Sequence, residues 1–153
     1  METQVVFTRT GSAAGVVDRL LGAAASSIDA ALYRLDSPRL VQSLGEASRR
    51  GLGLRLLLDR AKYEETAATR ILLEGAGITF RVLSGHRGPR SKMHHKFAIL
   101  DREMALTGSY NWTLESDENN HENLAILRDP LSVGEFVSEF EALWAESAAG
   151  NRS

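Results

Sequence analysis

The stretch Met93-His94-His95-Lys96-Phe97-Ala98-Ile99-Leu100-Asp101 organises this 153-residue sequence, because it places a histidine and a lysine within an apolar run. Side chains of a β-strand alternate between its two faces, so His94 and Lys96 are expected on the same face. The apolar residues that follow fall on both faces, which predicts a buried strand. Asp101 begins a turn into a second strand at Met104–Thr107. Because Asp101 has the opposite parity from His94, we expect a structural role for it.

Two polar stretches follow this motif strand, Thr107-Gly108-Ser109-Tyr110-Asn111-Trp112-Thr113 and His121-Glu122-Asn123. Ser109 and Asn111 repeat the one-residue spacing, so their side chains are expected to converge, and Glu122 opens another apolar strand. Attack on an anionic phosphodiester needs a nucleophile or base, a cation, neutral hydrogen-bonding groups and a carboxylate. The three stretches together favour a site of that kind.

The composition limits the class of protein. With 43% hydrophobic and 25% charged residues, the sequence is expected to form one globular domain over residues 1–153. The absence of cysteine excludes disulfides and cysteine-based zinc sites. A formal net charge of -2 argues against a protein that coats nucleic acid through bulk charge. No run approaches the roughly 18 apolar residues of a membrane-spanning helix, so we expect a soluble, cytoplasmic chain without a transmembrane segment. The compartment, including a removed signal or anchor, stays open.

A basic run leads into the motif strand. Arg87, Arg90, Lys92 and Lys96 fall within ten residues that contain no Asp or Glu. The segment Ser84–Lys92 also contains two glycines and a proline, so we expect it to be a mobile loop at the rim of the site. A run of this kind is often only a solvated loop. Its position directly before the motif strand favours substrate binding by Arg87, Arg90 and Lys92.

Apolar periodicity and capping residues predict an alternation of strands and helices. The expected strands are Gln4–Thr8, Ser27–Tyr33, Leu52–Leu58, Ile78–Leu83, the motif strand, Met104–Thr107 and Glu122–Leu127. The expected helices run from a cap at Ser12 to about Ser26, from Ser37-Pro38 to Gly51, over about Tyr63–Glu74 and over Val133–Ser147, with a short helix or loop in Asn111–Asn119. Repeated strand-helix units favour right-handed crossovers. The predicted fold class is α/β, with a mixed, largely parallel sheet and helices on both faces.

The spacing His94-x-Lys96, four residues and Asp101, with Gly108-Ser109 downstream, resembles the signature of the phospholipase D superfamily. The three stretches look most like those of its small single-motif members, the bacterial endonuclease-type phosphodiesterases and the mitochondrial phospholipase D-like proteins. The resemblance implies a phospholipase D-like fold and a phosphodiesterase that works through a covalent phosphohistidine. It implies no cofactor and no metal, because paired lysines would screen the charge of the phosphate.

Carried over by position, the resemblance implies a role for each polar residue. His94 would be the nucleophile or the acid and base, and Lys96 would bind the phosphate. Ser109 and Asn111 would hydrogen-bond the non-bridging oxygens as charge develops on them. Glu122 would orient the imidazole by accepting a hydrogen bond from its second nitrogen.

Asp101 and Gly108 complete the motif as structural residues. Larger relatives carry two copies of the motif, whereas this sequence carries one, so the resemblance implies a homodimer with a composite active site on its axis. The preferred substrate is DNA or RNA, cut without sequence preference. Two alternatives stay open. One is phospholipase D or cardiolipin hydrolase activity with the same residues, and the other is a catalytically idle nucleic-acid-binding module.

Overall fold

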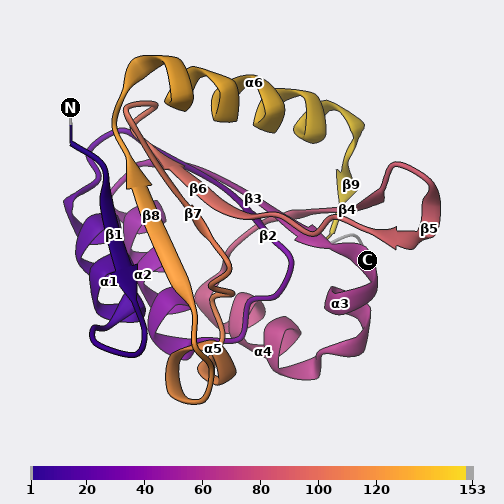
Figure 1. Cartoon of the computed structure of the whole chain (residues 1–153). Helices are drawn as coiled ribbons and strands as arrows, with labels where there is room; N and C mark the ends of the chain where they lie inside the picture. Colours follow the sequence, from indigo (N-terminus) through magenta and orange to yellow (C-terminus); the bar gives the residue numbers. More distant parts are fainter. Residues whose placement is uncertain (1, 151–153) are drawn as a thin grey trace.

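The computed structural model of the chain describes residues 2–150. The strands are β1 (Gln4–Phe7), β2 (Ser27–Leu32), β3 (Gly53–Asp59), β4 (Arg81–Gly85), β5 (Gly88–Lys92), β6 (Lys96–Leu100), β7 (Met104–Gly108), β8 (Asn123–Leu127) and β9 (Ala148–Ala149). The helices are α1 (Ala13–Ala23), α2 (Pro38–Arg49), α3 (Arg60–Glu65), α4 (Ala67–Ala76), α5 (Leu114–Glu118) and α6 (Pro130–Glu146). The sheet lies between two layers of helices (Figure 1).

The strands form one mixed sheet in the order β1-β8-β7-β6-β2-β3-β4-β5, with β9 paired to β4. The predicted α/β class with a mixed sheet is confirmed, but the prediction that the sheet is largely parallel is wrong. Within residues 2–150, only β2 with β3 and β3 with β4 are parallel, and the other pairs are antiparallel. Strand and helix alternate only as far as β4. Beyond it, hairpins join β4 to β5 and β6 to β7, and such tight turns can join only antiparallel strands. β8, which follows α5, is also antiparallel to both of its neighbours, β7 and β1.

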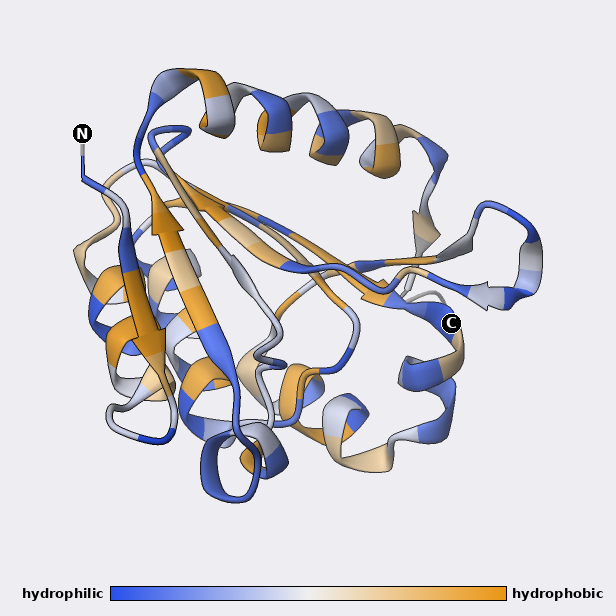
Figure 2. Cartoon of the chain, viewed as in Figure 1, coloured by the Kyte–Doolittle hydropathy of each residue, from blue (hydrophilic) through white to orange (hydrophobic). Residues whose placement is uncertain are grey.

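Helices cover both faces of the sheet, as predicted. The apolar sides of α1, α2 and α4 pack with Ala98 and Leu100 of β6 on one face. On the other face α6 packs against Phe97 and Ile99 of the same strand through residues such as Phe140. The alternation predicted for the motif strand is therefore confirmed. Figure 2 shows the apolar side of α6 turned toward the sheet and its polar side turned away.

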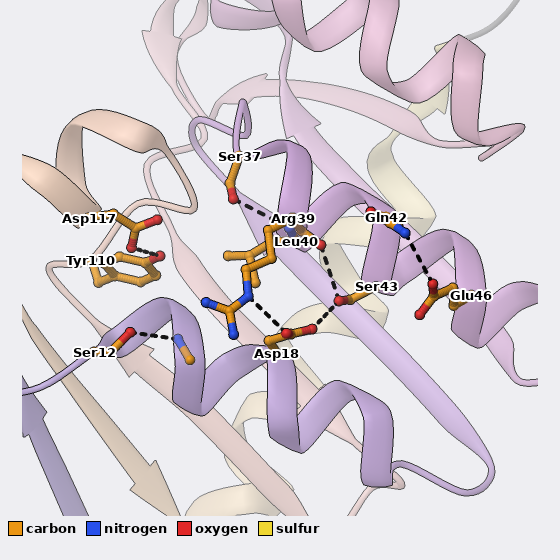
Figure 3. Close-up of polar contacts among 11 residues, drawn as sticks. Ser12, Asp18, Ser37, Arg39, Leu40, Gln42, Ser43, Glu46, Tyr110 and Asp117 are labelled. Atoms are coloured by element: carbon orange, nitrogen blue, oxygen red, sulfur yellow. Dashed lines mark hydrogen bonds and ion pairs between the residues drawn. The ribbon is translucent and has the colours of Figure 1, made fainter.

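Two predicted helix starts are confirmed in detail. The Ser12 side chain accepts a hydrogen bond from Gly15 N at 2.9 Å, and Ser37 accepts one from Leu40 N at 3.3 Å with Pro38 next in the chain. Figure 3 shows how the two helices that begin there are joined by polar contacts. Asp18 of α1 accepts hydrogen bonds from Arg39, at 2.8 Å, and from Ser43, both on α2.

Two further predictions need correction. The single helix predicted over Tyr63–Glu74 is two helices, because Thr66 has an extended backbone and separates α3 from α4. The fourth strand spans Arg81–Gly85 in place of Ile78–Leu83, and the predicted loop Ser84–Lys92 is largely the hairpin of β4 and β5. Gly88 makes this hairpin possible because its backbone has a φ of +96°. The apolar alternation that normally marks a strand is missing from the segment, so its pairing could not be predicted.

Candidate active site

The polar residues of the signature lie at one edge of the sheet, which the strand register sets. Lys96 at the start of β6 lies opposite Leu32 at the end of β2. Phe97 lies opposite Thr107 near the end of β7. Gly108, the last residue of β7, lies opposite Leu124 near the start of β8. The segments that carry the histidine, lysine, serine and glutamate therefore meet at the same edge.

His94 and Lys96 are in direct contact. Lys96 Nζ lies 3.2 Å from His94 Nδ1 and donates a hydrogen bond to the His94 carbonyl oxygen at 3.1 Å. Although His94 is solvent-exposed, partial burial of one side of its ring lowers its pKa below the ordinary value of 6.5, and the charges of Lys96 and Lys92 lower it further. Burial also lowers the pKa of Lys96, and the negative charge of Glu122 opposes that shift. Within one chain the neutral form of the imidazole, which is the form that can act as a nucleophile, is therefore favoured.

Ser109 and Glu122 form a second pair. Ser109 Oγ donates to Glu122 Oε1 at 2.6 Å, and Glu122 Oε2 accepts from Ser116 Oγ and from Asn120 Nδ2, each at 3.1 Å. Among the described residues no hydrogen bond joins Glu122 to His94. The orienting contact expected between them is therefore not made within one chain, where Glu122 instead holds Ser109 in place.

Asn111 carries the one unsatisfied polar atom found among the buried side chains of residues 2–150. Its Oδ1 is buried and has no hydrogen-bond partner. Buried polar groups are nearly always paired in folded proteins, and exceptions concentrate at functional sites. The unpaired atom is an acceptor, so the predicted hydrogen bond from Asn111 to a phosphate oxygen, which needs the amide nitrogen, stays a prediction.

The structural members of the signature make contacts of a different kind. Gly108 lies where β7 approaches β8, and a Cβ atom there would come within 2.2 Å of the Asn123 carbonyl oxygen, so only glycine fits. Asp101 is at the opposite end of β6 from Lys96. Its carboxylate accepts hydrogen bonds from the backbone of Ala25, Ser26 and Ser27 and from the Ser26 hydroxyl, at 2.7–3.1 Å. Asp101 therefore ties the α1–β2 connection to the β6–β7 turn.

Of the three basic residues predicted to bind substrate, Lys92 is the one that reaches the site. Its Nζ lies 5.8 Å from the ring centroid of Tyr33, which in turn lies 4.4 Å from the ring centroid of His94. Arg87 and Arg90 are exposed in the β4–β5 hairpin. Lys92 therefore lies near the histidine, whereas substrate binding by Arg87 and Arg90 stays a prediction.

Sequence reasoning missed two residues of the site, Tyr33 and Lys62. Tyr33 follows β2, is 8% exposed, and packs against the His94 ring. Lys62 in α3 places its Nζ 5.8 Å from the Tyr33 centroid. The only signal for Tyr33 was its place at the end of a predicted strand. Lys62 had no signal, because its neighbourhood depends on how α3 packs.

Two open grooves differ in their relation to this site. One of about 450 Å³ is lined by His94, His95, Lys92 and His86 and reaches α6, so it is connected to the signature residues. The other, of about 530 Å³, lies at the far end of β6 beside Asp101 and Arg128. The larger groove is remote from the histidine and lysine, so the smaller one is the better candidate for a substrate path.

The histidine and acidic side chains are dispersed through residues 2–150. No group of three or more histidine or acidic side chains there is placed to hold a metal ion. In the same part of the chain no helix combines the length and the apolar character needed to cross a membrane.

A family of known proteins described as "Cardiolipin synthase, PLD-like domain" matches residues 17–144 of the chain. The matched range runs from α1 to α6 and includes every polar residue of the signature. The chain belongs to the phospholipase D-like family. The family resemblance predicted from the motif is thereby confirmed.

This phospholipase D-like chain is similar to mitochondrial cardiolipin hydrolases. It is 39% identical to that of Mus musculus over 129 residues, which are 84% of this chain and 56% of the relative. Identity to the Homo sapiens protein is 38% over 129 residues, 84% of this chain and 49% of the relative. The chain thus spans about half the length of these curated relatives.

Solved structures share the fold of this phospholipase D-like chain. The phospholipase D family member Nuc from Salmonella typhimurium superposes with a TM-score of 0.86 at 24% identity, over 99% of both chains. NucT from Helicobacter pylori superposes with a TM-score of 0.83 at 19% identity, over 97% of this chain and 100% of the other. At these identities the likeness establishes the fold, and the predicted phospholipase D-like fold is confirmed.

Proposed function

We propose that this phospholipase D-like chain is a phosphodiesterase that cuts DNA or RNA without a metal ion and without sequence preference, through a site shared by two copies. The observation that carries the proposal is the contact of 3.2 Å between the His94 imidazole and the Lys96 ammonium group. A neutral imidazole beside a cation can attack a phosphodiester, because the cation screens the charge that repels a nucleophile.

The proposed reaction has two steps. First, the imidazole of His94 in one copy attacks phosphorus, a nitrogen–phosphorus bond forms, and the bond to the leaving oxygen breaks. His94 of the second copy, which would be held as imidazolium by the Glu122 carboxylate that faces it, gives its proton to that oxygen. Second, water attacks phosphorus and loses a proton to the second His94, the nitrogen–phosphorus bond breaks, and the phosphate product leaves, so that the first His94 is again a neutral imidazole and the second an imidazolium. Splitting one displacement into two lowers each barrier.

A homodimer follows from the single motif in the chain. One His94 cannot be nucleophile and general acid in the same step, and the family resemblance assigns the second role to the histidine of a second motif, so we propose that it comes from another copy. In a two-fold dimer the same edge of the sheet would face itself, and Lys96 would be paired across the axis. Glu122 would then be able to meet an imidazole of the other copy, a contact that it does not make within one chain.

Nucleic acid is the substrate best supported by charge. Lys92 lines the groove beside His94, and Arg87 and Arg90 are exposed in the same β4–β5 hairpin, so we propose that they extend the positive charge away from the reactive centre. Contacts to phosphates supply affinity without reading bases. We therefore propose cleavage that does not depend on sequence.

Hydrolysis of cardiolipin or another phospholipid is the second candidate. It is favoured by the 39% identity to mouse mitochondrial cardiolipin hydrolase. The same histidine and lysine would serve, since a phospholipid is also a phosphodiester. The nuclease and the phospholipase therefore differ only in which part of the substrate is bound outside the reactive centre, the rest of a nucleic acid strand or the rest of a lipid.

The substrate is tested by incubating the chain in EDTA with single-stranded DNA, double-stranded DNA, RNA and cardiolipin vesicles. Cleavage of nucleic acid in EDTA is expected, with His94→Ala as the inactive control. Loss of cleavage in EDTA would refute the metal-independent mechanism. Cleavage of cardiolipin alone would establish the second candidate, and inactivity on every substrate would favour an idle binding module.

The shared site is tested by mixing wild-type chains with His94→Ala chains and allowing them to exchange. If each site needs two His94 residues, activity should fall as the square of the wild-type fraction. If each chain carries a complete site, activity should fall linearly with that fraction. A linear fall, or full activity of a monomer, would refute the shared site.

A further inference from the structure

The lysines of this chain are gathered in one place. Of its eighteen lysine and arginine residues only three are lysines, Lys62, Lys92 and Lys96. They come from α3, β5 and β6, and their Nζ atoms lie 5.8, 5.8 and 5.5 Å from the ring centroid of Tyr33. We call these residues the lysine cluster. Since α3 packs against β5, the tertiary structure alone brings its members together.

The lysine cluster carries positive charge that the described part of the chain leaves largely uncompensated. Within residues 2–150 the cluster makes one ion pair, between Lys62 Nζ and Glu65 Oε2 at 3.1 Å, and the Glu65 side chain is 61% exposed. An exposed pair of this kind contributes at most about 1 kcal/mol, so an anionic ligand can compete with it. The charge of Glu122 also acts on Lys96, without an ion pair between them. The Tyr33 ring attracts the ammonium groups weakly and does not neutralise them. A concentration of like charge around a buried ring is the property of an anion-binding site.

The lysine cluster extends beyond the pair of His94 and Lys96. Lys96 contacts His94 and belongs to the phosphate that is attacked. The Tyr33 ring centroid lies 4.4 Å from that of His94, and the Nζ atoms of Lys62 and Lys92 lie 5.8 Å from the Tyr33 centroid. The distance from the His94 ring to either Nζ therefore cannot exceed the two distances together. A strand bound with one phosphate at His94 can thus place its next phosphate near these two lysines.

We propose that Lys62 and Lys92, supported by Tyr33, bind a second phosphate of the substrate, the one next to the scissile phosphate along a nucleic acid strand. This subsite rests on the proposed function. Lysine suits the role because its ammonium group is a compact charge on a flexible stem, which holds a phosphate without demanding one orientation. The subsite would make the chain select ligands with two phosphates over ligands with one.

Binding measurements on an inactive variant test the subsite independently of catalysis. In a His94→Ala background, thymidine trinucleotide, which has two phosphodiesters, is compared with thymidine dinucleotide, which has one. Lys62→Gln is expected to weaken trinucleotide binding roughly ten-fold and to reduce the preference for the trinucleotide by the same factor. With a longer single strand, the slope of log K against log salt should fall by about 0.7, the value for one lost phosphate contact. Arg19→Gln, an exposed position on α1 with the same change of charge, should alter neither quantity.

The outcomes are distinct. An equal effect of Lys62→Gln on both nucleotides, or the same salt slope as wild type, would overturn the subsite even if the wild-type chain cuts DNA. A selective effect on the trinucleotide would support the subsite even if no substrate were cut and the proposed function failed. A parallel titration compares vesicles of cardiolipin, which has two phosphates, with vesicles of phosphatidylglycerol, which has one. It tests whether the two phosphates belong to a lipid headgroup. Selectivity for cardiolipin without selectivity for the trinucleotide would overturn the assignment to nucleic acid.

Discussion

Replacing Asp101 with asparagine tests whether the last residue of the signature holds the fold together or takes part in chemistry. The Asp101 carboxylate accepts from three backbone N–H groups and one hydroxyl of Ala25, Ser26 and Ser27. Asparagine tolerates the left-handed backbone at this position, where φ is +56°, but it has one acceptor oxygen and no charge. Asp101→Asn therefore removes acceptors without changing the shape of the side chain.

The expected loss of stability follows from these contacts. Hydrogen bonds to charged groups contribute about 1.5–3 kcal/mol each and neutral ones about 1 kcal/mol. The donors lie near solvent, so water replaces part of each lost contact, and we expect the free energy of unfolding to fall by about 2 kcal/mol. For a chain of this length that is a decrease in Tm of roughly 4–8 °C.

The loss should also depend on pH. Burial would raise the pKa of Asp101, but the backbone donors of Ser26, Ala25 and Ser27 outweigh burial and hold the pKa below its ordinary value of 3.8. A carboxylate with a lowered pKa stabilises the fold above its unfolded pKa, and this stabilisation is lost as the pH falls through the folded pKa. The difference between wild type and Asp101→Asn should therefore be complete at pH 7 and shrink below pH 3.8.

The effect is measured by thermal and urea unfolding, followed by circular dichroism, at pH 7 and below pH 3.8. Glu103→Gln, which removes an exposed carboxylate from the same turn, is the matched control and should leave Tm unchanged. Folded Asp101→Asn should keep the kcat of wild type. The reasoning would be refuted by a variant that loses less than about 1 °C in Tm but turns over on the order of 100-fold more slowly.

Three further predictions concern the site and its support. His94→Gln should lower kcat on the order of 1,000-fold or more with no change in Tm, and retention of activity would show that His94 is not the nucleophile. The acid limb of kcat/KM against pH should lie below pH 6.5, because burial and the lysine charges lower the pKa of His94. Lys92→Gln should move that limb to higher pH, and an unmoved limb would contradict this account. Tyr110→Phe should lower the free energy of unfolding by about 1–2 kcal/mol in urea denaturation, because the buried Tyr110 hydroxyl donates to Asp117 (Figure 3) and the carboxylate would lose its partner.

The sequence by itself determined the local features of this protein. Alternation along the motif strand placed His94 and Lys96 on one face, and Ser12 and Ser37 marked the starts of two helices. The spacing of histidine, lysine and aspartate was specific enough to indicate the family. Each of these features depends on residues close together in the chain, whose geometry is set by the backbone and its hydrogen bonds.

Only the tertiary structure decided which distant segments meet. The sheet is mostly antiparallel because strands pair according to packing and connections, neither of which a local pattern encodes. Glu122 holds Ser109 within the chain, where we expected it to meet His94. Tyr33 and Lys62 join the site through the register of β2 with β6 and the packing of α3. The motif was therefore visible in the sequence, whereas the clustering of positive charge beside it was not.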